Sequence, residues 1–468
     1  MLTASAPRRS CGRPRVDLRA RRPDGRLMPP EVALVSDTLL DDAALFFVSY
    51  DGVVNNNSFQ RDAILTHAGY QYATWYTGSR HAVVARRPLG GEWERVVLPH
   101  RLRVDDSHNV ISLGVCPRDG TLHVAMDTHD NRVFYVKSTP GLTAGRPWEP
   151  SAFGAVRRTL DGVELGEVTY PQFVVTPEGV LQLSFRTGCS GNGVNELAEY
   201  RDGGWRRLGA WTSASGDYTG PNGVVSATRN MYLHGLDYDR RGRLHAAFTW
   251  REGDSGVLRD PGGLTNHDTG YVYSDDRGRT WRTDAGVVVG TTGGPPVGIS
   301  SPGVLVDRLG PDHGLMNQEG QAVDSTGTPH VVISYVPDRR VSDYAADRAR
   351  HARTFHLTRS DEGWTKREVP IRPRSTQRTK LVFDRADNAY LVMPRGRIVA
   401  ASRGWTDWAT VFEPAALGAF GEVNVDTTRI AVDGVLSVQY QRASTGTTPS
   451  PIRVADFRLG AGQDGTVK

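Results

Sequence analysis

The chain has 468 residues and a mass of 51.2 kDa, enough for one large toroidal fold or for two or three ordinary domains. Lys and Arg (56) nearly balance Asp and Glu (52), so the net charge of +4 excludes the global basic field of nucleic-acid-binding proteins. No stretch approaches the roughly 20 apolar residues of a membrane-spanning helix, and 52 Gly, 27 Pro and 10 Trp favour a chain of many short strands.

The N-terminal segment, residues 1–30, contains the basic run RRSCGRPRVDLRARRPDGR without apolar periodicity. This run predicts a disordered tail ahead of a single folded catalytic domain over residues 31–468. No apolar signal-peptide core follows it, so the chain as written is expected to be cytoplasmic, with Met28 as an alternative start. The cysteines are few and scattered, which predicts free thiols rather than disulfides or a zinc cluster: Cys11, Cys116 and Cys189.

A turn followed by an alternating strand recurs along the chain. Each copy has Asp or Gly in the turn and then apolar residues at period two, which is typical of a hairpin leading into a half-buried strand. Most copies lie about 60 residues apart, the length of a four-stranded propeller blade with loop insertions. The copies are PRDGTLHVAM (117–126), PEGVLQLSF (177–185), DRRGRLHAAF (239–248), DSTGTPHVVI (324–333) and DRADNAYLVM (384–393).

Tryptophans after Gly-rich or charged turns fall between these copies, at Trp93, Trp205, Trp281, Trp364 and Trp408. The segment SDDRGRTW, residues 274–281, also matches the Asp-box pattern of propeller hairpins. With one blade before these marks and one after, from about residue 411 to 457, the pattern predicts an all-β, seven-bladed β-propeller. Two stacked β-sandwiches are the alternative, but they would not explain one kind of turn recurring throughout.

Four residues with catalytic chemistry accompany the first repeats. His108 in DDSHN precedes the strand VISLGV, and His129 in the near-copy DTHDN follows the strand LHVAM, so an antiparallel hairpin would bring both imidazoles to one end. Tyr170 in VTYPQF and Arg186 in FRTGCSGNG would join them from a neighbouring blade. Propellers bind ligands on the axis, where such loops converge.

Two imidazoles, a phenol and a guanidinium do not include the paired carboxylates of ordinary glycoside hydrolysis. They suit β-elimination at a uronic acid, in which the C5 proton is removed and the oxygen on C4 leaves. An arginine against the carboxylate stabilises the enolate-like charge, while histidine or tyrosine takes one proton and supplies another.

Each of these residues also has a purely structural interpretation. A histidine between Asp and Asn can be a hydrogen-bonded turn residue, Tyr170 can pack at a blade edge, and Arg186 can cap the glycine turn beside it. The matched settings of the two histidines favour function. In contrast, three histidines recur at one position of the strand repeat and are expected to be packing residues: His123, His245 and His330.

Taken together, these motifs resemble the BNR-repeat propeller family of polysaccharide lyases over about residues 50–340. Its members include ulvan lyases and L-rhamnose-α-1,4-D-glucuronate lyases, and a related branch comprises α-L-rhamnosidases. The motifs are NSFQRDAILTHAGYQYATWY, DDSHNVISLGV, GTLHVAMDTHDN, VTYPQF, FRTGCSGNG, GRLHAAFTWRE, NHDTGYVYSDDRGRTW and LMNQEGQAVDSTGTPHVV.

The resemblance implies roles for the four residues already singled out. His108 and His129 would line the catalytic pocket, Tyr170 would serve as acid, base or both, and Arg186 would neutralise the uronate carboxylate. Which of the two histidines and Tyr170 is the base stays open. The family is normally exported, so the resemblance implies secretion, in contrast to the chain as written.

Three further residues are implied as substrate contacts. Tyr232 in RNMYLHG and Arg251 in TWRE would lie near the pocket, and Gln60 in NSFQ stands where the rhamnosidase branch has a histidine, which favours the lyase. Cys189 replaces the usual serine of its motif, so substrate fit is expected to differ.

The expected function is therefore a lyase acting on rhamnosyl-uronate linkages of an anionic oligo- or polysaccharide. The alternatives are an α-L-rhamnosidase on the same linkage and a non-catalytic glycan-binding propeller; a single good Asp box argues against a sialidase. No cofactor is expected to be required, although two spaced histidines can also serve a structural Ca or Zn ion. We expect a monomer without nucleic-acid or membrane partners.

Overall fold

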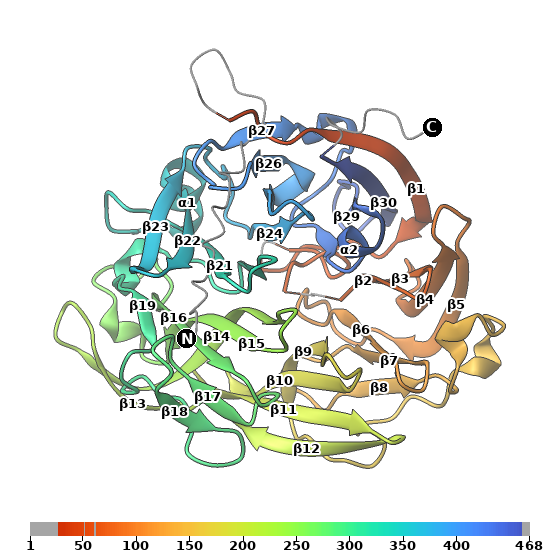
Figure 1. The fold of residues 1–468 in the computed structure, drawn as a ribbon, viewed down its shortest axis with the longest axis horizontal. Helices are drawn as coiled ribbons and strands as arrows, with labels where there is room; N and C mark the ends of the chain where they lie inside the picture. Colours follow the sequence, from red (N-terminus) through yellow and green to blue (C-terminus); the bar gives the residue numbers. More distant parts are fainter. Residues whose placement is uncertain (1–26, 51, 60–61, 461–468) are drawn as a thin grey trace, which may run out of the picture.

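The structure, a computed structural model, describes residues 27–50, 52–59 and 62–460. Antiparallel sheets are arranged around a central axis as the blades of a β-propeller (Figure 1). The expected all-β propeller fold is thus confirmed. Most of the expected N-terminal tail, together with Cys11 and Gln60, lies outside the described residues.

The first sheets in chain order come from the N-terminal half. One contains β2 (Ile64–His67), β3 (Tyr70–Tyr76), β4 (His81–Pro88) and β5 (Glu94–Arg101); the next contains β6 (Ile111–Cys116), β7 (Thr121–Met126) and β8 (Phe134–Lys137). A third contains β9 (Val168–Val175), β10 (Leu181–Cys189), β11 (Asn192–Arg201) and β12 (Gly204–Ala210). In Figure 1 these sheets follow one another around the ring.

The largest sheet is central in the chain. It contains β13 (Ser215–Thr219), β14 (Val225–Tyr238), β15 (Leu244–Glu252), β16 (Asn266–Ser274), β17 (Thr280–Arg282), β18 (Val288–Thr291) and β19 (Leu305–Asp307). Two four-stranded sheets follow: β20 (Gly320–Val323), β21 (Pro329–Tyr335), β22 (Arg353–Ser360) and β23 (Gly363–Val369), then β24 (Lys380–Phe383), β25 (Ala389–Val392), β26 (Ile398–Ala401) and β27 (Ala409–Phe412). The short helices are α1 (Tyr344–His351) and α2 (Arg429–Asp433).

The last sheet joins the two ends of the described chain. Its strands are β28 (Asn424–Asp426), β29 (Val435–Gln441), β30 (Ser450–Leu459) and, at its outer edge, β1 (Val32–Ala44), which pairs with β30 (Figure 1). The sequence reading placed residues 44–77 in an N-terminal blade and began the last blade near residue 411. The structure differs because β27 belongs to the preceding sheet and the N-terminal strand completes the last one.

The turn-strand repeats form as expected. The turn residues Gly120, Gly179, Gly242 and Gly327 all have left-handed backbone, and Asp387 takes the same conformation in the fifth copy, where Asp tolerates it better than most side chains. The strands that follow them are β7, β10, β15, β21 and β25; each is the second strand of its sheet in chain order except β15, which is the third.

The Asp box is also confirmed. Asp276 accepts hydrogen bonds from the Ser274 hydroxyl at 2.7 Å and from the Thr280 backbone at 2.7 Å. Trp281 is fully buried and stacks on Trp211 with ring centroids 4.0 Å apart. The histidines of the strand repeat are buried, as expected of packing residues: His123, His245 and His330. Apolar clusters between neighbouring sheets form the rest of the core. No helix in the described ranges is both long and apolar enough to cross a membrane.

A buried ionic network lies where the chain ends meet. Asp456 on β30 accepts hydrogen bonds from Arg87 at 2.8 Å, from Ser36 at 2.8 Å and from Ser437 at 2.7 Å, and Arg429 lies 2.9 Å from its other oxygen. These partners come from β4, β1, β29 and α2. The carboxylate therefore links the closing sheet to its neighbour.

Replacing Asp456 with alanine is expected to lower the free energy of unfolding by about 3–5 kcal/mol, because it leaves buried guanidiniums without their counter-charge. The Arg87 and Asp456 side chains are 2% and 5% exposed. The matched control is Glu368→Ala, which removes the exposed pair with Arg353 and is expected to cost about 0–1 kcal/mol. Urea unfolding followed by tryptophan fluorescence measures both; equal losses would contradict the expectation.

Candidate active site

A cavity of about 520 Å³ opens near the axis, lined by loops and strand ends of several sheets. Six of the seven residues singled out from the sequence line it, and Gln60 lies outside the described residues: His108, His129, Tyr170, Arg186, Tyr232 and Arg251. The structure therefore brings together side chains that are up to 143 positions apart in the chain. Asp130, Arg378 and Glu422 also line the cavity and were not singled out.

One carboxylate holds the two histidines. The Nδ1 atoms of His108 and His129 lie 2.7 Å and 2.6 Å from the two oxygens of Asp106, and the rings stack with centroids 4.4 Å apart. Phe59 stacks on the outer face of His108 at 5.1 Å. Asp106 was missed, although its position two residues before His108 is the spacing of an Asx turn, and its oxygen also accepts the His108 backbone N–H at 2.9 Å.

This arrangement determines which ring nitrogen of each histidine donates to Asp106. Although burial opposes ionisation, the hydrogen bonds from His108 and His129 hold the pKa of Asp106 far below its usual range, so it accepts only. Both Nδ1 atoms therefore donate to Asp106, and in neutral His108 Nε2 is left as an acceptor. Burial lowers the pKa of His108 despite the carboxylate, so its neutral form dominates at neutral pH.

A bulge positions Tyr170. The register of β9 against β10 shifts between the pairs Gln172 with Ser184 and Thr169 with Arg186, so two residues of β9, Tyr170 and the proline after it, lie opposite the single residue Phe185 of β10. Tyr170 has a left-handed backbone, with φ of 57°. Such strain in a non-glycine residue persists only where the surroundings enforce it, and it is concentrated at functional sites.

Arg186 is buried beside Tyr170. Its Nη2 donates to Asp130 Oδ1 at 2.7 Å and to Thr169 Oγ1 at 3.1 Å, and its guanidinium carbon lies 5.1 Å from the Tyr170 ring centroid. Asp130 is 41% exposed, so solvent screens its charge while Arg186 is only 2% exposed. The Arg186 guanidinium therefore remains a source of positive potential at the Tyr170 phenol.

Tyr232 forms a pair with Tyr170, with ring centroids 6.0 Å apart, and donates to Ser190 Oγ at 3.1 Å. Burial alone would raise its pKa, but Arg186 and Arg251 outweigh that effect and hold the Tyr232 pKa below its ordinary value of 10.0. Burial and the charge of Tyr232 raise the pKa of Tyr170 far above the usual range. The first proton lost by this pair therefore leaves the negative charge on Tyr232.

Arg378 is a second buried guanidinium that the sequence reading missed. It donates to the backbone and side-chain oxygens of Asn317 at 2.9 Å and 2.8 Å and to Glu422 at 3.1 Å, and it lies over the Phe59 ring at 5.3 Å. It precedes β24 by two residues, outside the part of the chain covered by the recognised motifs. Only the position of Arg378 before the inner strand of a blade could have indicated that it belongs to this cavity.

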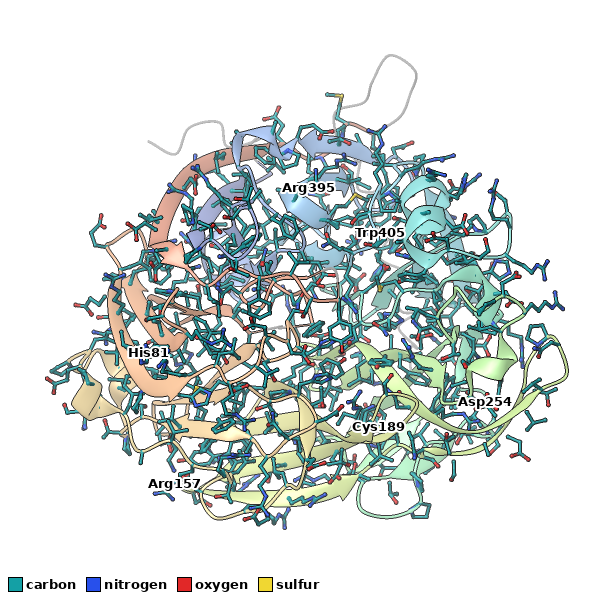
Figure 2. All side chains as sticks on the ribbon, turned by 180° about the vertical axis from the view of Figure 1, so that it is seen from behind. His81, Arg157, Cys189, Asp254, Arg395 and Trp405 are labelled. Atoms are coloured by element: carbon teal, nitrogen blue, oxygen red, sulfur yellow. The ribbon has the colours of Figure 1, made fainter. Side chains whose placement is uncertain are left out.

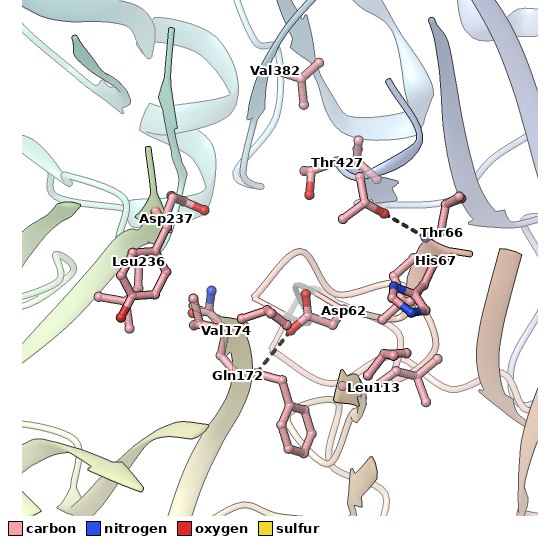
Figure 3. A pocket seen from close by; sticks show the side chains of 18 of the residues that line it. Asp62, Thr66, His67, Leu113, Gln172, Val174, Leu236, Asp237, Val382 and Thr427 are labelled. Carbon is pink, nitrogen blue, oxygen red and sulfur yellow. Dashed lines mark hydrogen bonds between the residues drawn. The ribbon is translucent and has the colours of Figure 1, made fainter. Parts of the chain in front are cut away.

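A second axial cavity, of about 390 Å³, lies at the other end of the inner strands. Asp62, His67, Gln172 and Asp237 face this space from separate segments (Figure 3). Among the described residues, the two cavities share no lining residue, and neither the imidazole pair nor an arginine lines the second. The first cavity is therefore the candidate active site.

Cys189 lies at the end of the β10–β11 hairpin beside the first cavity, exposed as a free thiol. In Figure 2 it lies nearer the centre of the ring than His81 or Arg157. The other described cysteine, Cys116, is a buried free thiol, which confirms the expectation for these two residues.

Solved structures of similar fold include polysaccharide lyases. The polysaccharide lyase Uly1 has a TM-score of 0.70 at 19% identity, with 91% of this chain and 99% of that chain covered. An ulvan lyase described as bound to -[GlcA(1-4)Rha3S]- has a TM-score of 0.61 at 13% identity, with 89% and 94% covered. At these identities the likeness concerns the fold.

Sequence comparison identifies relatives of the chain and its family. The long isoform of an ulvan lyase from Pseudoalteromonas sp. (strain PLSV) is 28% identical over 264 residues, which are 47% of this chain and 25% of that protein. The chain thus matches a quarter or less of the length of its first curated relatives. The model of the BNR repeat-containing family matches residues 70–372. Because that match spans well over half of the chain and includes the blades that supply most of the cavity, the chain belongs to the BNR repeat-containing family.

Proposed function

We propose that the chain is a polysaccharide lyase that cleaves rhamnosyl-uronate linkages by β-elimination and leaves an unsaturated uronate. The observation that carries this proposal is the Tyr170–Tyr232 pair, set between the guanidiniums of Arg186 and Arg251 and facing two imidazoles in one cavity. The names of the curated relatives and the glucuronate–rhamnose ligand of the similar structure support the same substrate class.

Recognition of the uronate is assigned to Arg186. A guanidinium donates charge-assisted hydrogen bonds to a carboxylate and neutralises the charge that develops on it when C5 loses its proton. Asp130 and Thr169 hold Arg186 through Nη2, and Nε is buried beneath the tyrosine pair, so Nη1 is the nitrogen left for the substrate carboxylate. His108 accepts a hydrogen bond from a sugar hydroxyl through Nε2, and His129 contacts the substrate beside it.

Proton transfer is assigned to the tyrosine pair. In its reactive state Tyr232 is ionised and accepts a hydrogen bond from the Tyr170 hydroxyl. As the Tyr170 oxygen takes the C5 proton, its own proton moves to Tyr232; the C4 oxygen then leaves with a proton from Tyr170, which recovers one from Tyr232. The pair ends with the charge it had at the start, and the sugar gains a C4–C5 double bond.

The substrate assay is direct. Purified protein is incubated with ulvan, gum arabic and a model rhamnosyl-glucuronide, and the ultraviolet absorbance of the unsaturated uronate is followed while products are identified by mass spectrometry. A rise in absorbance is expected on at least one of them. Free L-rhamnose without that rise would overturn the proposal in favour of a rhamnosidase, and binding without any product would make the chain a glycan-binding propeller.

The ionisation of Tyr232 predicts the pH dependence. We expect kcat to rise with pH and to level off above an apparent pKa lower than the ordinary 10.0 of tyrosine. Replacing Arg251 with methionine removes a positive charge that favours the phenolate, so this limb should move to higher pH. Profiles of both proteins give the shift; a limb that stays in place would show that the tyrosine pair is not the group that titrates.

We propose that catalysis requires no metal. Asp106, His108 and His129 offer three donor atoms within 4.8 Å of one another, so the cluster could hold an ion. Its Nδ1–O contacts of 2.6–2.7 Å are hydrogen-bond distances and are shorter than the roughly 3.3 Å between ligand atoms of a tetrahedral site with Zn–N bonds of about 2.0–2.1 Å. Because the Nδ1 protons are needed for these bonds, dialysis against EDTA should leave kcat unchanged and added Zn²⁺ should inhibit. Loss of activity with EDTA that Ca²⁺ or Zn²⁺ restores would contradict this.

The proposal also includes the number of blades and the boundaries of the domain. Seven separate sheets over the described residues support seven blades, with β1 completing the last, and the pairing of β1 with β30 supports one domain over residues 31–468. An anionic oligo- or polysaccharide is the proposed partner of a monomeric protein.

A further inference from the structure

A small cavity lies directly beneath the tyrosine pair. It has a volume of about 20 Å³, and its lining includes Tyr170, Tyr232 and Arg186, with Ser184 and Gln318 on its other sides. A buried space of about 10–15 Å³ is sufficient for one water molecule when two or more polar groups line it. This cavity therefore has the size and the polarity of a single-water site.

Two buried polar atoms in its lining residues pair with no described protein atom. They are the Nε of Arg186, a donor, and the Oε1 of Gln318, an acceptor. The two residues are 2% and 7% exposed. Leaving such groups unsatisfied costs about 1–3 kcal/mol each, and one water can satisfy both, since it accepts from the first and donates to the second.

The backbone fixes the direction of the Gln318 side chain. Gln318 has left-handed φ of 53°, the same strained conformation as Tyr170 across the cavity. Its neighbours are held on both sides: Asn317 accepts two hydrogen bonds from Arg378, and the buried carboxylate of Glu319 accepts one from the Ser334 hydroxyl. Gln318 is therefore held so that its side-chain amide points in one direction.

We infer that this cavity holds one resident water molecule, fixed by Arg186 Nε and Gln318 Oε1, that hydrogen-bonds the Tyr170–Tyr232 pair. The water accepts the Nε–H of Arg186 and donates one proton to Gln318 Oε1. Its second proton is then available to the phenolate oxygen, and a hydrogen bond to the charged form lowers the pKa of the pair. This role in catalysis rests on the proposed lyase function, whereas the water site does not.

The test combines crystallography with tyrosine titration. In a crystal structure at a resolution that shows ordered water, density is expected within hydrogen-bond distance of Arg186 Nε and Gln318 Oε1. In Gln318→Met, which keeps the length of the side chain and removes the acceptor, that density should disappear. The rising limb of the rate profile should shift upward by about one pH unit, the equivalent of one lost hydrogen bond to a charged group.

The matched control is Gln321→Met, on the same segment but lining the second cavity, which should leave the limb in place. Spectrophotometric titration of tyrosine should show the same upward shift in Gln318→Met without any substrate. Absence of the density in the wild-type protein, or an unmoved tyrosine titration in Gln318→Met, would overturn the inference. Failure of every polysaccharide assay would overturn the lyase function alone, because density and titration do not depend on activity.

Discussion

Replacement of Tyr170 by phenylalanine is expected to lower kcat by about 10²- to 10⁴-fold, the contribution typical of a positioned acid or base. The substitution removes only the oxygen that exchanges protons with the sugar and with Tyr232. The ring contacts to Phe59 at 5.2 Å and to Arg186 at 5.1 Å are retained, so the variant should fold and bind substrate with little change in KM.

The matched control is Tyr344→Phe. Tyr344 lines the same cavity from α1, and among the described residues its hydroxyl donates to the Met316 sulfur at 3.5 Å, so its loss should leave kcat nearly unchanged. Initial rates from the ultraviolet assay and thermal unfolding curves are measured for both. If Tyr170→Phe kept wild-type kcat, the proton relay would be wrong and Tyr232 or a histidine would have to act on the sugar directly.

Local patterns predicted the blades well because their signals are local. The five turns could be identified from Asp and Gly alone, since a left-handed turn residue excludes most side chains, and the Asp box followed from its own hydrogen bonds. Ring closure could not be predicted in this way. The pairing of β1 with β30 joins segments more than 400 positions apart, and nothing near residue 35 indicates its partner.

The candidate site shows the same difference between local and long-range signals. His108 and His129 could be placed together because a single hairpin joins their motifs, and Tyr170 with Arg186 because β9 and β10 are neighbours. Arg378 was missed because its position depends on a blade outside the recognised motifs.

The bulge at Tyr170 and the strained backbone of Gln318 were missed because they result from packing around the axis rather than from local propensity. The residues missed from the sequence are thus those whose positions depend on tertiary contacts.

The assignment of Arg186 to the uronate carboxylate leads to the second large effect. Replacing Arg186 with methionine should reduce kcat/KM by about 10²- to 10³-fold, as expected when a group that stabilises developing negative charge is lost. The protein should remain folded, because Asp130, the ionic partner left behind, is 41% exposed and can be solvated. Arg186→Lys keeps the charge without the planar, fixed donor geometry of the guanidinium, so its loss should be intermediate.

A methyl-esterified substrate separates charge recognition from a general structural effect. Esterification removes the negative charge that Arg186 neutralises and makes the C5 proton more acidic. Rates are compared above the rising limb of each protein, where the tyrosine pair is ionised in both, and there Arg186→Met should retain most of the wild-type kcat/KM on the ester while losing it on the free uronate. An equal loss on both substrates would show that Arg186 supports the shape of the site rather than the carboxylate. Because Arg186 Nε also lines the small cavity beneath the tyrosines, the tyrosine titration of Arg186→Met should shift upward as well. The two readouts together distinguish substrate charge from the ionisation of the tyrosine pair.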